Sequence, residues 1–233
     1  MKKPVDYRGF SLRKLTQPRF RHMLLLLGWV GYFLLYFLTE NLIPWERCTL
    51  IHCGLDDLIP FNEYFALFYV GWYVLVFGSL AYTLFFDVEG FKRLQKFIMV
   101  TQAVAMLCYI LWPSRQDLRP EVFPRDNLLT RAMAFIYSFD TPTGVCPSLH
   151  VGYSLGVLSV GLKDRDLRPV WKVLLTVFVV MISVSVCFVK QHSALDVVFA
   201  LPLGLLAEAL VYRDWWRDRG IALRRRKAGG EKT

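Results

Sequence analysis

Long apolar blocks are the feature that most restricts how this chain folds. Several stretches of about 18–22 residues are almost entirely apolar, and each is long enough as an α-helix to cross a hydrocarbon core about 30 Å thick. A soluble domain of 233 residues would instead alternate apolar and polar faces, whereas here 55% of the residues are hydrophobic. We therefore expect an all-α, polytopic membrane protein.

The blocks predict six transmembrane helices in one domain over residues 23–212. A basic arm, 1–22, precedes this domain, and a basic tail, 213–233, follows it. The predicted spans are 23–38, 64–86, 97–112, 148–162, 170–189 and 194–212.

Two connections between the spans have features of their own. The segment 87–96 carries five charged residues and is predicted to be a turn. The segment from Pro113 to Pro147 is a long, proline-rich loop, within which residues 132–139 are expected to form a short interfacial helix.

The distribution of basic residues predicts the orientation in the membrane. Six spans place both termini on one side, and the two terminal segments with the two short turns on that side carry 22 of the 28 Lys and Arg residues. Positively charged segments remain on the cytoplasmic side. Both termini are therefore expected to be cytoplasmic, and the partner of the positive charge is expected to be the membrane surface and not nucleic acid.

Two histidines at the predicted outer ends of spans are the candidate catalytic residues. His192 precedes Asp196 by four residues, so at the start of a helix both side chains lie on one face. A carboxylate that accepts the proton of one imidazole nitrogen fixes the tautomer and leaves the other nitrogen free to attack an electrophile. His150 begins the fourth span and has no acidic residue at the same spacing. It is expected to donate a proton to the leaving group.

Several residues near these histidines suit a phosphate group. Arg119 can hold phosphate oxygens in a bidentate manner, and the backbone N–H groups that follow Ser148 can bind an anion at a helix N-terminus. Lys190 lies two residues before His192. Taken singly, each of these residues also has an ordinary structural role, for example Ser148 as a helix cap.

Three short motifs resemble those of the type 2 phosphatidic acid phosphatase superfamily, which includes the lipid phosphate phosphatases and the inositol phosphorylceramide synthase branch. Pro147-Ser148-Leu149-His150 resembles its second motif, His192-x-x-x-Asp196 its third, and Arg119-Pro120 the end of its first. The resemblance implies a helical-bundle catalytic core and a phosphohistidine intermediate. It implies that His192 is the nucleophile, that Asp196 orients it, that His150 is the general acid and base, and that Ser148 and Arg119 bind phosphate.

The chain departs from the family pattern at two cationic positions. Trp112 stands where the first motif begins with Lys, and Val186 stands where the third motif has Arg. Arg115 and Lys190 are expected to substitute for them as phosphate ligands. The departures resemble the branch that contains the inositolphosphoryl transferases.

Three functions remain open from the sequence. The first is a lipid phosphatase that hydrolyses a lipid phosphomonoester or pyrophosphate. The second is a phosphotransferase that moves a phospholipid headgroup to an alcohol or lipid acceptor, as in the synthesis of inositol phosphorylceramide or sphingomyelin. The third is a non-catalytic transporter or scaffold, for which His192 and Asp196 would have no chemical role.

The remaining histidines and the cysteines indicate no metal or cofactor. His22 and His52 lack an acidic helical partner, and the five cysteines lack the paired spacing of a zinc site. Cys48 and Cys53 lie in one predicted outer loop, where they form either a disulfide or two free thiols. We expect phosphate transfer without metal or cofactor.

Overall fold

The computed structural model describes residues 2–219 and is almost entirely helical. Four short 3-10 segments accompany the main elements, at Leu12–Lys14, Arg21–Leu26, Trp45–Arg47 and Glu63–Phe65. The main helices are α1 (Leu27–Leu42), α2 (Gly54–Leu58), α3 (Ala66–Phe86), α4 (Val88–Leu111), α5 (Leu128–Phe139), α6 (Leu149–Lys163), α7 (Pro169–Phe188) and α8 (Ala194–Val211). Two short parallel strands, β1 (Thr49–Leu50) and β2 (Ser114–Arg115), complete the fold.

Five helical segments within residues 2–219 are long and apolar enough to cross a membrane: Arg21–Leu42, Glu63–Phe86, Val88–Leu111, Pro169–Phe188 and Ala194–Val211. Their outward faces are apolar, with Phe37 of α1 63% exposed and Val173 of α7 61% exposed. Apolar surface on this scale is not found on a soluble monomer. The chain is therefore an all-α integral membrane protein.

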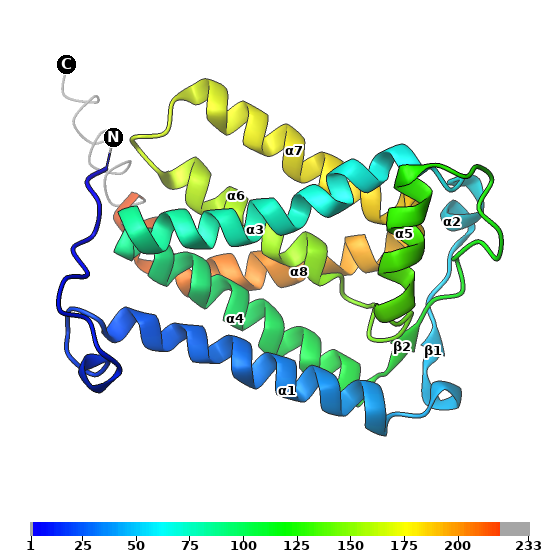
Figure 1. Ribbon diagram of the computed structural model, residues 1–233, viewed down its shortest axis with the longest axis horizontal. Helices are drawn as coiled ribbons and strands as arrows, with labels where there is room; N and C mark the ends of the chain where they lie inside the picture. Colours follow the sequence, from blue (N-terminus) through cyan, green and yellow to red (C-terminus); the bar gives the residue numbers. More distant parts are fainter. Residues whose placement is uncertain (1, 220–233) are drawn as a thin grey trace, which may run out of the picture.

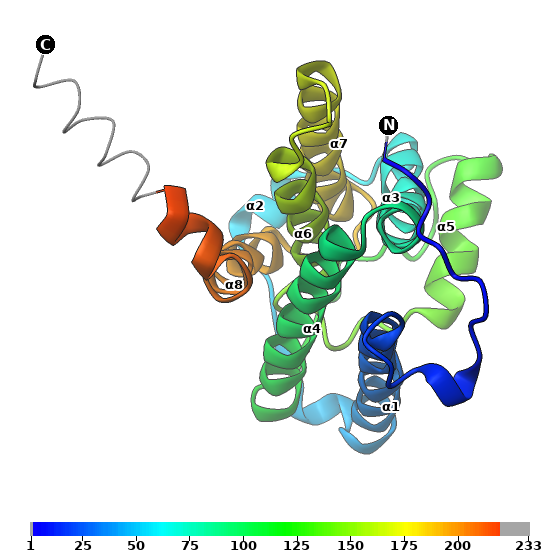
Figure 2. The same ribbon diagram turned by 90° about the vertical axis from the view of Figure 1, so that its left-hand side faces the viewer.

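The fourth predicted span, 148–162, corresponds to α6, which is shorter than the other five helical segments. It has 15 residues and is therefore about 22 Å long at 1.5 Å per residue. It packs against α3, α4, α7 and α8 in the middle of the bundle. Figure 2 looks along the bundle and shows α1 and α7 at opposite edges, with α6, α3 and α4 between them.

Glycines allow α6 to approach its neighbours closely. A Cβ at Gly156 would lie 2.8 Å from the ring of Phe97 on α4, and a Cβ at Gly204 on α8 would lie 2.5 Å from the side chain of Leu155. Small residues at such contacts are typical of helix packing in membranes.

The expected turn at 87–96 is wrong, because α4 already begins at Val88. Asp87 caps this helix by accepting a hydrogen bond from the backbone N–H of Gly90 at 2.9 Å. The charged residues that suggested a turn lie in the first turns of α4. The expected short helix in the following loop is present as α5, and it begins four residues earlier than predicted.

The short turns and the N-terminal arm meet at one end of the bundle. The ammonium of Lys2 lies 2.5 Å from a carboxylate oxygen of Asp87 and 2.8 Å from one of Asp164, so the arm joins the α3–α4 and α6–α7 turns. Lys163 and Glu208 form an ion pair of 2.6 Å at the same end. Figure 1 shows α5 across the opposite end, almost at right angles to the long helices and beside β1 and β2. Of the predicted basic tail, residues 220–233 lie outside the described part of the chain.

Candidate functional site

A histidine and a carboxylate form the centre of the candidate site, at the end of the bundle that carries α5. His192 lies in the short connection between α7 and α8, and Asp196 lies in the first turn of α8. His192 Nδ1 is 3.1 Å from Asp196 Oδ2, which also accepts a hydrogen bond of 3.0 Å from the backbone N–H of Ser193. The Asp196 side chain is fully buried. This contact favours the His192 tautomer with hydrogen on Nδ1 and a free lone pair on Nε2.

His150 faces the free nitrogen of His192. It lies in the first turn of α6, and its Nδ1 is 3.3 Å from His192 Nε2. The ring of Trp72 packs against the His150 imidazole at a centroid distance of 4.4 Å, and Tyr69 packs at 4.7 Å. His150 Nε2 is buried and has no hydrogen-bond partner among the described residues. The two imidazoles and Asp196 thus form a continuous polar chain from α8 to α6.

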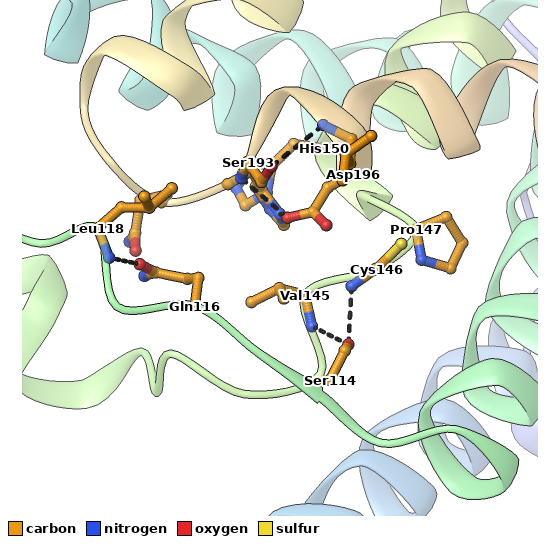
Figure 3. A network of polar contacts seen from close by, with 12 residues as sticks. Ser114, Gln116, Leu118, Val145, Cys146, Pro147, His150, Ser193 and Asp196 are labelled. Carbon is orange, nitrogen blue, oxygen red and sulfur yellow. Dashed lines mark hydrogen bonds and ion pairs between the residues drawn. The ribbon is translucent and has the colours of Figure 1, made fainter. Parts of the chain in front are cut away.

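The segment before α6 is fixed by backbone contacts. Ser114 Oγ accepts hydrogen bonds from the backbone N–H groups of Val145 at 3.2 Å and Cys146 at 3.1 Å, as Figure 3 shows. Tyr109 donates a hydrogen bond of 2.8 Å to the carbonyl of Pro147. Ser148 then begins α6, and its buried hydroxyl has no partner within residues 2–219. A phosphate oxygen near the N-terminus of α6 would supply one.

Arg119 reaches the site through Gln191. Its Nη2 donates a hydrogen bond of 2.5 Å to Gln191 Oε1, and its guanidinium lies 4.5 Å from the centre of the Tyr137 ring. Gln191 Nε2 in turn donates to Asp140 Oδ2 at 2.9 Å. Arg119 is therefore linked to Asp140 through the side chain of Gln191, the residue that precedes His192 in the chain.

Lys190 and Arg115 point to other partners. Lys190 has a positive φ of 53°, and its ammonium donates a hydrogen bond of 2.8 Å to the backbone carbonyl of Asp56. The Arg115 guanidinium lies 4.6 Å from the centre of the Trp45 ring. Within the described residues neither side chain makes a hydrogen bond or ion pair with a histidine, and the expectation that both substitute for the missing family cations stays a prediction.

The two departures from the family motifs occupy apolar or peripheral positions. Val186 is fully buried in the contact of α7 with α3 and α5. The indole of Trp112 donates a hydrogen bond of 2.9 Å to Thr49 Oγ1 beside β1.

Asp56 supports the site but was not identified from the sequence. Its carboxylate accepts hydrogen bonds from Ser193 Oγ at 2.6 Å and from the backbone N–H of Ala194 at 2.8 Å, and so holds the start of α8. Burial by itself raises the pKa of Asp56, but the hydrogen bonds from Ser193, Ala194 and Cys53 outweigh it and hold the pKa below its usual value. Its local partner is Cys53, but its contacts with the start of α8 involve residues more than 130 positions later in the chain, which no local pattern reveals.

Asp140 and Gln191 were also missed. Asp140 ends α5 and lies beside Gln191, while Tyr69 Oη donates to its carboxylate at 3.4 Å. Burial raises the pKa of the Asp140 carboxyl, and the nearby Arg119 partly opposes this rise. Gln191 adjoins His192 in sequence, which is the one signal that could have singled it out.

A cavity of about 340 Å³ opens onto the two histidines. Asp140, Thr141, Gln191, His150 and His192 form its polar end. Aromatic side chains form most of the remaining wall: Trp29, Tyr32, Phe33, Tyr36, Trp72, Tyr73, Phe77, Tyr109, Phe139 and Tyr153. A larger cavity of about 870 Å³ lies near Lys2 at the other end, between α3, α6 and α7, and contains no histidine. The two candidate histidines therefore line the smaller cavity.

Within residues 2–219, no three His, Cys, Asp or Glu side chains are placed to hold a metal ion together. All five cysteines are free, so the open question at Cys48 and Cys53 is answered by two thiols. Comparison of the chain with known protein families, curated proteins and solved structures finds no match in any of the three. Functional assignment therefore depends on the motif residues and their arrangement.

Proposed function

We propose that the chain is an integral-membrane lipid phosphatase, which hydrolyses a lipid phosphomonoester or pyrophosphate through a phosphohistidine at His192. The observation that carries the proposal is the chain of contacts from Asp196 to His192 at 3.1 Å and from His192 to His150 at 3.3 Å, at the end of a cavity. The motif resemblance to type 2 phosphatidic acid phosphatases agrees with this arrangement.

In the first step, His192 Nε2 attacks phosphorus and the bond from phosphorus to the lipid oxygen breaks. Asp196 stabilises the Nδ1–H that the modified ring must keep. His150 transfers a proton to the leaving oxygen, so a phosphomonoester releases a neutral lipid alcohol and a pyrophosphate releases a lipid phosphate. In the second step, His150 accepts a proton from water, and the hydroxyl oxygen displaces His192 to release phosphate.

Phosphate binding is proposed for Ser148, Arg119 and the backbone N–H groups at the start of α6. The Ser148 hydroxyl is buried without a partner, and Arg119 needs only to exchange Gln191 for a phosphate oxygen. Charge-assisted hydrogen bonds from the guanidinium would strengthen as negative charge develops on the phosphoryl group. Lys190 and Arg115 have no such role in the arrangement described here. The proposed reaction needs neither metal nor cofactor.

The proposed orientation places the histidines on the extracytoplasmic side. Three segments that carry basic residues, namely the N-terminal arm, the first turns of α4 and the α6–α7 turn, lie at the Lys2 end of the bundle, opposite α5. Because positive charge favours the cytoplasmic side, the end with α5 is proposed to face outward.

Headgroup transfer from a lipid phosphodiester is a second candidate, which the charge of the cavity favours. Arg119 donates a hydrogen bond to Gln191, while the Asp140 carboxylate lines the cavity wall and no Lys or Arg of the described residues does so. A phosphodiester carries one negative charge fewer than an ionised monoester, so it needs fewer cations. In this reaction an alcohol, in place of water, would attack the phosphohistidine.

The decisive experiment uses the purified full chain in lipid nanodiscs with a panel of lipid phosphomonoesters, pyrophosphates and diesters. Free phosphate and new lipids are measured in parallel, and acid-labile phosphate on the protein reports the phosphohistidine. His192→Ala should abolish all three signals, whereas the control His52→Ala, which lies outside the cavity beside Asp57, should retain them. Activity that survives His192→Ala would refute the proposal.

A further inference from the structure

The wall of the 340 Å³ cavity combines one carboxylate with many aromatic rings. Asp140 lines this wall, and its Oδ2 accepts hydrogen bonds from Gln191 and Tyr69. Tyr73 and Trp72 of α3 and Tyr36 of α1 line the same cavity. Aromatic faces attract cations through their quadrupole, and quaternary ammonium groups are recognised in this way.

A second carboxylate lies at the rim. Glu40 accepts a hydrogen bond of 2.8 Å from Thr143 Oγ1 and one from Thr141 Oγ1, and both threonines line the cavity. Arg119 lies close enough to Asp140 to oppose the rise of its pKa, so one guanidinium charge stands against two carboxylates. Asp140 and Glu40 together outweigh that single cation, and the field at this side of the cavity favours positive charge.

The side of the cavity next to His150 presents hydrogen-bond donors instead of carboxylates. Two buried side chains line this side of the cavity: Trp72, which is 7% exposed, and Tyr153, which is 2% exposed. Neither Trp72 Nε1 nor Tyr153 Oη has a hydrogen-bond partner among the described residues. An unpaired buried donor costs free energy until an acceptor is supplied. A ligand with acceptor oxygens near His150 and a positive charge near Asp140 would satisfy both sides.

We propose that this cavity selects lipid phosphate esters that carry a cationic nitrogen close to the phosphorus, with the nitrogen held by Asp140 and the aromatic wall. The inference rests on the proposed function, because it names the substrate class of the same site. Two kinds of lipid offer this chemistry: a phosphodiester with a choline or ethanolamine headgroup, and a phosphomonoester of an amino-alcohol lipid. In the diester, the cation would sit on the headgroup; in the monoester, it would sit on the lipid backbone.

Selectivity is tested by turnover on two matched pairs of substrates. The diester pair is phosphatidylcholine and phosphatidylglycerol with the same acyl chains. The monoester pair is sphingosine 1-phosphate, which has an amine, and lysophosphatidate, which has none. We expect the full chain to prefer the cationic member of at least one pair by about tenfold or more in kcat/KM, and the pair that shows the preference identifies the kind of lipid.

Asp140→Asn removes the charge and keeps the size of the side chain, and it should abolish most of that preference by lowering kcat/KM for the cationic member far more than for the neutral member. Glu40→Gln is the second variant and should reduce the preference less. Asp117→Asn is the matched control, since its carboxylate is half-exposed and contacts His52 outside the cavity. Equal turnover of both members of each pair, or a preference unchanged in Asp140→Asn, would overturn the inference.

A binding measurement separates this inference from the proposed reaction. The inactive His192→Ala protein is titrated with a short-chain phosphocholine lipid and with the matching phosphoglycerol lipid. Selective binding of the phosphocholine lipid that is lost in the His192→Ala/Asp140→Asn double variant supports the cation site, even if the active chain turns over no lipid. Turnover without cation selectivity would leave the proposed reaction standing and refute the cation site.

Discussion

The backbone N–H of Ser148 donates a hydrogen bond of 3.1 Å to the carbonyl oxygen of Asp196. The residue that begins α6 and the residue that orients His192 are therefore joined directly through the main chain. A substitution at either side chain leaves this contact in place, because it uses backbone atoms alone. Substitutions of the Ser148 or Asp196 side chain therefore test the role of that side chain while this backbone contact is kept.

The two histidines should differ when the substrate has a good leaving group. A nitrophenolate leaving group needs no proton from His150. The His150→Ala variant should therefore release nitrophenolate about a hundredfold faster than His192→Ala does. His150→Ala should also accumulate acid-labile phosphate, because water then attacks the phosphohistidine slowly. Asp196→Asn should fall between the two variants, since it disturbs the tautomer without removing the nucleophile.

The label itself provides the control. It should disappear in the His150→Ala/His192→Ala double variant. Label that persists there would identify a different nucleophile and contradict the assignment of His192.

Arg119→Ala should lower kcat by about 10²–10³, the effect expected when a group that stabilises developing charge is removed. Arg115→Ala should have little effect, because its guanidinium packs on Trp45 away from the histidines. Steady-state kinetics of both variants in the same nanodiscs provide the comparison. Loss of activity in Arg115→Ala equal to that in Arg119→Ala would show that Arg115 enters the site.

Asp56→Ala should destabilise the protein by about 1–3 kcal/mol, because the Ser193 hydroxyl and the Ala194 N–H would lose their buried acceptor. The start of α8 would then be held less firmly, and kcat should fall more than KM changes. Thermal unfolding and kinetics measure the two effects. The adjacent Asp57→Ala is the control, as its carboxylate is exposed and contacts only His52; an equal loss in that variant would argue against a specific role for Asp56.

Binding of a cationic lipid should weaken as the pH falls. Burial raises the pKa of Asp140, with Arg119 and His192 opposing the rise and Glu40 reinforcing it. The carboxylate form binds the cation, so affinity should be full above this raised pKa and lost as the pH drops through it. Because the pKa is raised, the loss should begin at a higher pH than for an ordinary aspartate near 4.

Titration of the phosphocholine lipid at a series of pH values, with wild type and Asp140→Asn, measures this effect. The variant should bind weakly and with a flatter pH profile. The same profile in both proteins would show that a group other than Asp140 is responsible for the pH dependence.

Orientation is testable with single cysteines in a cysteine-free background. Val122 is 82% exposed in the loop before α5, and Asp166 lies exposed in the turn between α6 and α7. An impermeant thiol reagent on intact cells should modify Val122→Cys at once and Asp166→Cys only after permeabilisation. The reverse pattern would invert the proposed topology.

The sequence was most informative where local patterns decide the structure. Apolar blocks located the five long helices, and the spacing of His192 and Asp196 correctly predicted a contact within one helical turn. Charge was a poorer guide to helix ends, since Lys92, Arg93 and Lys96 were assigned to a turn although Asp87 caps a helix that contains them. Local charge does not reveal where a helix leaves the hydrocarbon.

Long-range contacts account for what could not be predicted. Lys190 was expected at the phosphate because of its closeness to His192 in sequence, but its positive φ and the Asp56 carbonyl direct it elsewhere. Asp140 reaches the cavity only because α5 lies across the end of the bundle, beside Gln191. Such placements depend on tertiary packing, which a single sequence does not display.

The shortness of α6 has a consequence for the proposed reaction. The helix is about 22 Å long, whereas a hydrocarbon core is about 30 Å thick, and the charges of Lys163 and Asp164 at its C-terminal end favour the interface. With that end at the interface, the His150 end would lie about 8 Å short of the opposite headgroups. A lipid would then enter laterally from the bilayer, with its phosphate below the level of the other headgroups. After the reaction, the apolar product would return to the bilayer and the ionic product would leave into water.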